Sequence, residues 1–163
     1  RSTRVRASAA SEVYKSQSGY SAICLAEGLA EGGKLYTFEI NDEMEDFTRP
    51  WIEGSSVADK IDFRIGDANV EAPKLGIHFD LAFVDGDKRT YLETYEMVLS
   101  ILNPGGYILA DNTLWDGHVI DPAYDKDHQT QGIRKFNDFI AQDPRVEVVI
   151  LPLRDGLTLI RKK

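Results

Sequence analysis

Hydrophobic and polar residues follow two rhythms along the chain from residue 21 onward. Apolar residues that recur every three or four positions predict helices, at residues 21–30, 42–51, 91–102 and 133–140. Short apolar runs bounded by glycine, proline or polar residues predict strands, at residues 34–40, 61–65, 79–84 and 106–110. Pro50 and Gly54 are expected to break the chain after the second helix. Strands that alternate with helices indicate a doubly wound α/β fold, in which helices cover a parallel sheet.

The C-terminal end departs from this alternation. Residues 146–151 and 157–160 are two further predicted strands, and the five residues between them are Pro-Leu-Arg-Asp-Gly. A parallel crossover needs a dozen or more residues, so these strands must be antiparallel if they pair. The sequence therefore predicts a mostly parallel sheet closed by an antiparallel hairpin strand, which is less usual than a plain dinucleotide-binding fold.

Composition narrows the class of protein. The 163 residues are 42% hydrophobic, and the formal net charge of −8 disfavours nucleic acid and anionic lipid as partners. The one cysteine, Cys24, allows no disulfide within the chain, which fits a reducing cytoplasm. No apolar run approaches the ~20 residues of a membrane span. We expect a soluble, cytoplasmic protein.

The first 18 residues differ in character from the rest. Together with Gly19 they carry a net charge of +3, whereas the remainder carries −11. The alternatives are a mobile arm, an organellar leader, a truncated start or joined segments. We divide the chain into residues 1–18, an N-terminal arm or incomplete segment, and residues 19–163, the folded domain.

Polar residues follow the predicted strands, where open α/β sheets bind ligands. Glu39 ends one strand and has the position of a carboxylate that accepts ribose hydroxyls, although an ordinary strand-end acid facing water is equally consistent. Asp67 follows the next strand and suits either the amine of an adenine or the N-cap of a helix. A glycine-rich loop before the first helix is poorly represented, since only Gly19 stands there.

Three residues at two neighbouring strand ends form a sharper set. Asp85, Asp111 and Asn112 offer carboxylate and amide oxygens, the ligands of a hard cation such as Mg²⁺. Helix capping by Asp85 or Asp87 and Asp-Asn turn chemistry are the simpler alternatives. Lys88, three residues after Asp85, is placed to take a proton there, and otherwise is a solvated surface charge.

Aromatic and histidine residues near these strand ends suggest a binding pocket. Trp115 offers a rigid apolar wall to a planar ligand. His118 either lines that pocket or lies in a loop, whereas His78 and His128 are expected at the surface.

Taken in order, six segments resemble the cation-dependent class I O-methyltransferases of the catechol and caffeoyl-CoA type. The segments are GYSAICLAEGL, KLYTFEIN, FDLAFVDGDK, GGYILADNTLWDG, QTQGIRKFNDFIAQDPRVE and LPLRDGLTLIRKK. The resemblance implies a Rossmann-like, seven-stranded sheet whose last strand is antiparallel. It also implies S-adenosylmethionine as methyl donor, Mg²⁺ (or Mn²⁺ or Ca²⁺), a small phenolic acceptor and a homodimer.

The resemblance assigns roles to individual residues. It makes Lys88 the catalytic base, which takes the proton of a metal-chelated catechol hydroxyl during in-line methyl transfer, and Trp115 a pocket residue. The implied metal ligands are Asp85, Asp111 and Asn112. The implied cofactor-binding residues are Gly19, Tyr20, Ser21, Glu39, Ile40, Asp67, Ala68 and Asp85.

The first motif departs from the family, because Val13 and Lys15 stand where Glu and Gly are expected. A cofactor-binding remnant without turnover is therefore one alternative. An aspartyl-phosphate phosphatase with Asp85 as nucleophile is another, although Arg89 stands where its motif has Thr or Val. A plain nucleotide dehydrogenase explains neither the metal set nor the terminal hairpin.

Overall fold

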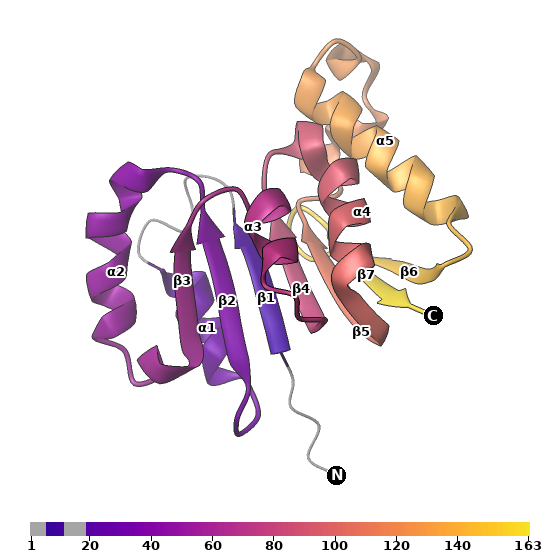
Figure 1. Ribbon diagram of the computed structural model, residues 1–163. Helices are drawn as coiled ribbons and strands as arrows, with labels where there is room; N and C mark the ends of the chain where they lie inside the picture. The colour runs from indigo at the N-terminus through magenta and orange to yellow at the C-terminus, as the bar shows by residue number, and fades with distance from the viewer. Residues whose placement is uncertain (1–5, 12–18) are drawn as a thin grey trace.

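The structure is a computed structural model that describes residues 6–11 and 19–163, and it contains one mixed β-sheet (Figure 1). The sheet has seven strands in the order β3-β2-β1-β4-β5-β7-β6. The strands are β1 (Arg6–Ser11), β2 (Lys34–Glu39), β3 (Ile61–Ile65), β4 (Phe79–Asp85), β5 (Leu102–Asp111), β6 (Val146–Leu151) and β7 (Leu157–Lys162).

Strand directions agree with the prediction of a mostly parallel sheet with a reversed hairpin. The pairs that link β3, β2, β1, β4 and β5 are all parallel. In contrast, β7 pairs antiparallel with both β5 and β6. The hairpin therefore closes the sheet beside β5, so its turn lies near the carboxyl ends of the parallel strands.

Strand β1 lies in a segment that the sequence analysis placed outside the folded domain. It pairs with β2 on one side and β4 on the other, with Ala9 opposite both Thr37 and Phe83. The sheet thus includes residues before 19, and the division into an arm or incomplete segment over residues 1–18 and a domain from residue 19 left out this inner strand. The sequence of β1, RASAAS, is rich in residues of low strand propensity. Its strand conformation is therefore determined by pairing with β2 and β4 rather than by its own residues.

Helices cover both faces of the sheet (Figure 1). In Figure 1, α3 and α4 lie in front of the strands and α1 lies behind them. The helices are α1 (Tyr20–Glu27), α2 (Glu45–Glu53), α3 (Ala68–Lys74), α4 (Tyr91–Ile101) and α5 (His128–Gln142). Short 3₁₀ helices are η1 (Asp42–Met44), η2 (Ala58–Lys60), η3 (Lys88–Thr90), η4 (Trp115–Ile120) and η5 (Pro122–Tyr124).

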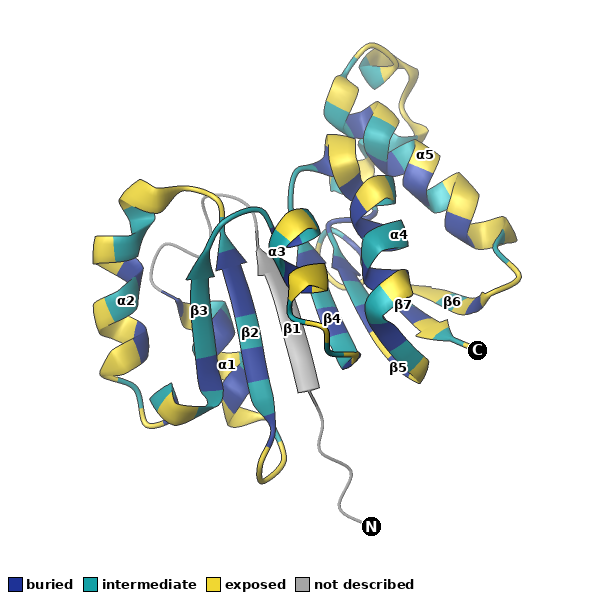
Figure 2. Ribbon diagram, in the orientation of Figure 1, coloured by how far each residue is buried: buried dark blue, intermediate teal, exposed yellow. Residues whose placement is uncertain are grey.

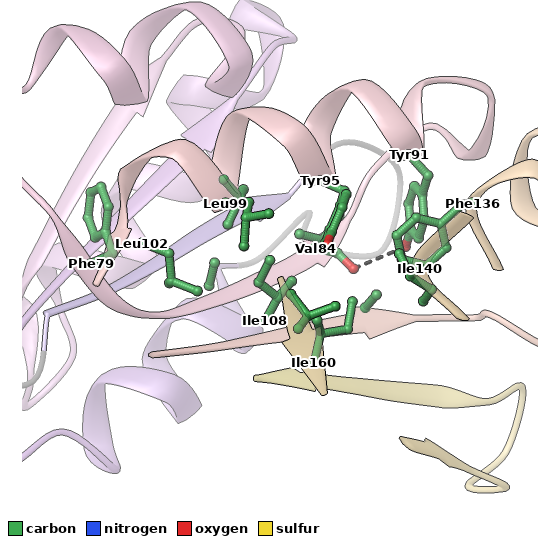
Figure 3. Packing of buried hydrophobic residues seen from close by; sticks show 14 of the residues in the cluster. Phe79, Val84, Tyr91, Tyr95, Leu99, Leu102, Ile108, Phe136, Ile140 and Ile160 are labelled. Carbon is green, nitrogen blue, oxygen red and sulfur yellow. Dashed lines mark hydrogen bonds between the residues drawn. The ribbon is translucent and has the colours of Figure 1, made fainter. Parts of the chain in front are cut away.

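Buried apolar residues form a large cluster on the α4–α5 side and smaller clusters around α1 and α3. In the large cluster, Phe136 from α5 packs edge-on against Tyr91 and Tyr95 of α4 (Figure 3). Figure 2 shows buried stripes along the strands and exposed outer faces on the helices. The largest core thus lies between helices α4 and α5 on one side and strands β4, β5 and β7 on the other. It is next to the strand ends that carry the predicted metal ligands.

Two local expectations about helices are corrected. Pro50 lies inside α2 rather than ending it, because it removes one N–H donor while its carbonyl still accepts from Gly54 N at 3.0 Å. Helix α1 ends at Glu27 with Gly28 as its C-cap, earlier than the predicted end at residue 30. Cys24 on this helix is exposed.

Among the helices in residues 6–11 and 19–163, none is both long and apolar enough to cross a membrane.

Candidate active site at the carboxyl ends of β4 and β5

Asp85 and Asp111 end two neighbouring parallel strands. Strand pairing places Val84 opposite Ala110. The next residue of each strand, Asp85 in β4 and Asp111 in β5, therefore lies at the same edge of the sheet. Both aspartates are partly exposed. The structure therefore brings together the two carboxylates that the sequence analysis proposed as metal ligands.

Lys88 lies between these strand ends and is buried, with only 4% of its surface exposed. Its Nζ donates to Asp85 Oδ1 at 3.3 Å, to the Asp111 carbonyl at 3.3 Å and to the Tyr91 hydroxyl at 2.6 Å. The alternative of a solvated surface lysine is wrong. A buried lysine amine needs hydrogen-bond partners, and these three acceptors supply them.

The backbone around Lys88 is fixed by α5. Gln129 Oε1 accepts a hydrogen bond from Lys88 N at 2.9 Å. A Cβ atom added to Gly132 would lie 2.2 Å from the Lys88 carbonyl oxygen, so only glycine permits this approach. Asp87 caps η3 by accepting from Arg89 N at 3.0 Å, and the Arg89 side chain lowers the pKa of the Asp87 carboxyl. Capping thus falls to Asp87, as one of the alternatives had it, while Asp85 contacts Lys88.

Asn112 follows Asp111 in a left-handed backbone conformation, with φ of 59°, and is buried. Its backbone N–H donates to Asp111 Oδ1 at 2.8 Å. Two carboxylates and one amide are the oxygen donors that a hard cation prefers, so the chemistry of this set fits Mg²⁺. Within residues 6–11 and 19–163, no group of three or more His, Cys, Asp or Glu side chains is arranged to hold a metal. A cation here would therefore need oxygens from water or a ligand to complete its coordination.

The β6–β7 turn holds the loop that follows Asn112. Thr113 N donates to the Gly156 carbonyl at 3.1 Å, and Leu114 N donates to the Asp155 carbonyl at 2.9 Å. The buried hydroxyl of Thr158 bonds that of Thr113 at 2.7 Å. The antiparallel hairpin therefore supports the loop between the predicted metal ligands and the predicted pocket wall.

Trp115 lies beside Lys88, with its ring centroid 5.9 Å from Lys88 Nζ. Its backbone φ of 48° is strained for a side chain of this size, and strain of this kind often occurs at functional sites. The structure thus places the predicted pocket wall next to the predicted base.

Arg134 of α5 organises the segment after Trp115, a role that the sequence analysis missed. Its guanidinium donates to the carbonyls of His118 at 2.9 Å, Val119 at 2.9 Å and Asp121 at 2.8 Å. The His118 ring stacks on Tyr124 at 3.5 Å between centroids. His118 thus lies in η4, where its ring contacts Tyr124, whereas His78 and His128 are exposed as expected.

The predicted cofactor residues lie at the ends of β2 and β3. Glu39 Oε1 accepts from Asn41 N at 2.9 Å, and the Glu39 carbonyl accepts from Gly66 N at 2.8 Å. Asp67 Oδ1 accepts from Asn69 N at 2.8 Å, so Asp67 is the N-cap of α3 as the simpler alternative proposed. A carboxylate has about four acceptor positions, so Glu39 and Asp67 can each still accept hydrogen bonds from a ligand.

Gly19 and Ser21 line a small cavity together with Glu39. Gly19 has a φ of +67°, and an added Cβ would lie 2.8 Å from the Ile52 side chain, so glycine is required at this position. The other residues predicted to bind the cofactor do not line this cavity: Tyr20 is 69% exposed, Ile40 is 51% exposed, and Ala68 is buried in a cluster with Phe38 and Ala72. The first-motif positions Val13 and Lys15 lie outside the described residues.

Comparison with known proteins identifies relatives for nearly the whole chain. A family model of O-methyltransferases matches residues 8–163. Caffeoyl-CoA O-methyltransferase 1 of Eucalyptus globulus is 38% identical over 157 residues, which cover 88% of this chain and 63% of the relative. Tricin synthase 1 of Oryza sativa subsp. japonica is 37% identical, with 88% and 63% covered. The chain thus spans less than two thirds of the length of these relatives.

Solved structures give the same family. An O-methyltransferase from Bacillus cereus in complex with SAH aligns with a TM-score of 0.85 and 31% identity, covering 98% of this chain and 74% of that one. The family match includes the Asp85–Asp87 segment, which removes the reason for reading that segment as a phosphatase motif.

Proposed function

The chain belongs to the O-methyltransferase family, and on that premise we propose that it transfers a methyl group from S-adenosylmethionine to a hydroxyl of a catechol-like acceptor, with a divalent cation. The observation that carries this proposal is the buried Lys88 amine at the shared edge of β4 and β5, between Asp85 and Asp111. The relatives' names, caffeoyl-CoA O-methyltransferase and tricin synthase, support a phenolic acceptor.

The reaction requires one bond to break, one to form and one proton to leave. The acceptor oxygen attacks the methyl carbon, the bond from sulfur to that carbon breaks, and S-adenosylhomocysteine (SAH) departs. Lys88, as the neutral amine, receives the proton of the reacting hydroxyl at Nζ. General-base assistance of this kind contributes ~10²- to 10⁴-fold to rate, and in-line positioning can contribute roughly 7 to 11 kcal/mol.

Asp85, Asp111 and Asn112 would hold the divalent cation, by the chemistry of their oxygen donors. When bound, Mg²⁺, Mn²⁺ or Ca²⁺ stabilises negative charge on acceptor oxygens. Trp115 would form an apolar wall that orients a planar ring beside Lys88. The β6–β7 turn then keeps the loop between these residues in place.

Glu39 would accept both ribose hydroxyls of the cofactor, and Asp67 would accept from the adenine amine. Gly19 and Ser21, which line the same cavity as Glu39, would also contact the cofactor. Family resemblance alone adds Tyr20, Ile40, Ala68 and Asp85 to the proposed cofactor contacts. We also propose that the protein is a homodimer and that it is cytoplasmic. Light scattering of the purified protein tests whether it is a dimer.

The experiment that tests the function is methyl transfer from radiolabelled S-adenosylmethionine to 1,2-dihydroxybenzene, with and without Mg²⁺. We expect transfer that stops when EDTA removes the cation, and little transfer to the 1,3-dihydroxy isomer, whose oxygens cannot chelate one ion. Equal transfer to both isomers would contradict the cation-dependent mechanism. Binding of SAH without any transfer would favour a cofactor-binding remnant.

A further inference from the structure

Tyr91, on the first turn of α4, has a buried hydroxyl at the centre of the site. The residue is 1% exposed, and its hydroxyl lies 2.6 Å from Lys88 Nζ, 2.7 Å from the Asp111 carbonyl and 3.0 Å from the Val84 carbonyl. Figure 3 shows the bond to Val84, with the hydroxyl pointing from the core toward β4. One side chain therefore connects the lysine to the ends of both β4 and β5.

Hydrogen-bond directions make this connection specific. A phenol has one proton to donate and lone pairs to accept with, so Tyr91 donates to a strand-end carbonyl and accepts from Lys88. The Lys88 Nζ also lies 4.3 Å from the centroid of the Tyr91 ring. The hydroxyl and the ring of Tyr91 together restrict where the lysine amine lies.

The ring of Tyr91 is itself held in place. It packs edge-on against Phe136 of α5, at 5.3 Å between centroids and 84° between planes. The position of Lys88 therefore depends on the packing between α4 and α5.

We propose that Tyr91 is a positioning residue that holds the Lys88 amine at the strand ends, and this proposal rests on the proposed methyl transfer. The contact of Lys88 Nζ with the Tyr91 hydroxyl, at 2.6 Å, is shorter than its contacts with Asp85 Oδ1 and the Asp111 carbonyl, both at 3.3 Å, so loss of the hydroxyl lets the amine shift. Displacement of a reacting group by about 1 Å can cost ~10²-fold in rate. Tyr91 thus acts on catalysis through Lys88.

The first variant is Tyr91→Phe, which keeps the ring and its contact with Phe136 but removes the hydroxyl. We expect kcat to fall by ~10- to 100-fold, with little change in the acceptor KM or in SAH affinity. The matched control is Tyr95→Phe on the same helix, because Tyr95 is also buried and also packs on Phe136, but its hydroxyl bonds Asp143 at 2.8 Å. Tyr95→Phe should keep the wild-type kcat.

A double-mutant cycle separates positioning from general stabilisation of the core. If Tyr91 acts through Lys88, Tyr91→Phe has no further effect on kcat in a Lys88→Met background. If Tyr91→Phe lowers kcat by the same factor in both backgrounds, the proposal is overturned. Wild-type kcat in Tyr91→Phe overturns it as well.

A second measurement needs no turnover, and its decisive observation is made on the wild-type protein. In protein with ¹³C-labelled lysine, the ε-CH₂ signal of Lys88 is assigned by its loss in Lys88→Met. We expect two inequivalent, restricted ε protons in the wild type and averaged ones in Tyr91→Phe. A freely rotating Lys88 in the wild type overturns the proposal even if Tyr91→Phe does not fold. Absence of methyl transfer by a wild type with a restricted Lys88 would instead contradict the proposed function.

Discussion

The two edges of the candidate site are built differently. At the ends of β2 and β3, Glu39 and Asp67 each bond a backbone N–H only two residues further along the chain. At the ends of β4 and β5, contacts join distant elements: Lys88 N bonds Gln129, 41 residues away, and Thr158 bonds Thr113, 45 residues away. The two carboxylates of the first edge are thus held by local turns, whereas Lys88 and the loop after Asn112 at the second edge are held by contacts with distant elements.

This difference follows from the tasks that we propose for the two edges. A nucleoside with several hydrogen-bonding groups can be held by carboxylates in turns, since each contact contributes separately. Proton and methyl transfer instead require a base and an acceptor oxygen in one fixed geometry. The edge proposed for chemistry is accordingly held from α4, α5 and the terminal hairpin.

The largest effect is expected from Asp111→Ala. Loss of a metal ligand should reduce cation-dependent turnover by at least ~10²-fold, because the ion contributes several kcal/mol to the stabilisation of developing charge. SAH affinity should stay within about twofold of wild type, because the metal serves the acceptor. Methyl-transfer assays and calorimetry measure the two quantities. Unchanged turnover would remove Asp111 from the metal set.

Lys88→Met should lower kcat by ~10²- to 10⁴-fold with a smaller change in the acceptor KM, as expected for loss of a general base. Methionine keeps much of the apolar stem, so packing near Trp115 is retained. Raising the pH should partly restore this variant, because hydroxide can take the proton, whereas Asp111→Ala should not recover. Comparing pH–rate profiles of the two variants tests this, and wild-type kcat at neutral pH would show that Lys88 is not the base.

Glu39→Ala changes the other edge. Loss of charge-assisted hydrogen bonds, worth roughly 1.5 to 3 kcal/mol, should weaken SAH binding by about 10- to 150-fold. At saturating cofactor, kcat should stay near the wild-type value. Calorimetric titration with SAH gives the affinity. A wild-type affinity would leave Glu39 as a strand-end acid that bonds only its own turn.

The contact between α5 and η3 is tested by Gly132→Ala. The new Cβ would lie 2.2 Å from the Lys88 carbonyl oxygen, so α5 must move away. Overpacking of this kind costs about 1 to 3 kcal/mol in the free energy of unfolding, and kcat should fall as Lys88 shifts. Gly28→Ala is the control, because its Cβ would meet the Leu25 carbonyl at an ordinary 3.5 Å. Equal urea midpoints for the two variants would contradict the close approach.

The smallest effect concerns the end of α5 and the pH dependence of stability. Arg145 lowers the pKa of the buried Asp143 carboxyl to about 2 from an ordinary 3.8. Because this pKa is depressed in the folded state, the stabilisation is complete above pH 3.8 and is lost as the pH falls toward 2. It amounts to about 2 kcal/mol. Urea unfolding of wild type and Asp143→Asn between pH 5 and 2 measures it, and parallel pH curves would contradict it.

The same division explains what could be predicted from the sequence. Apolar spacing located most helices and strands, and the short hairpin connection fixed the direction of β7. Asp85, Asp111 and Lys88 were found because parallel strands end at one edge, so residues that follow them meet there. Local information was sufficient for each of these steps.

Features that depend on partners far away in the chain were missed. The segment of β1 has no large apolar residue, and its place becomes clear only from the strands on both sides. Tyr91 fitted the apolar face of a helix, and nothing nearby indicated that its hydroxyl meets Lys88. Nothing next to Arg134 or Gln129 in the sequence indicates their roles, since their hydrogen-bond partners lie in other elements.

Titration of SAH into the wild-type protein, with and without Mg²⁺, tests most directly whether the two edges work separately. We predict measurable binding with the same dissociation constant in both conditions, because Glu39 and Asp67 hold the cofactor and the cation serves the acceptor. Binding that requires Mg²⁺, or that tightens severalfold when Mg²⁺ is added, would contradict the division of the site into a cofactor edge and a chemical edge.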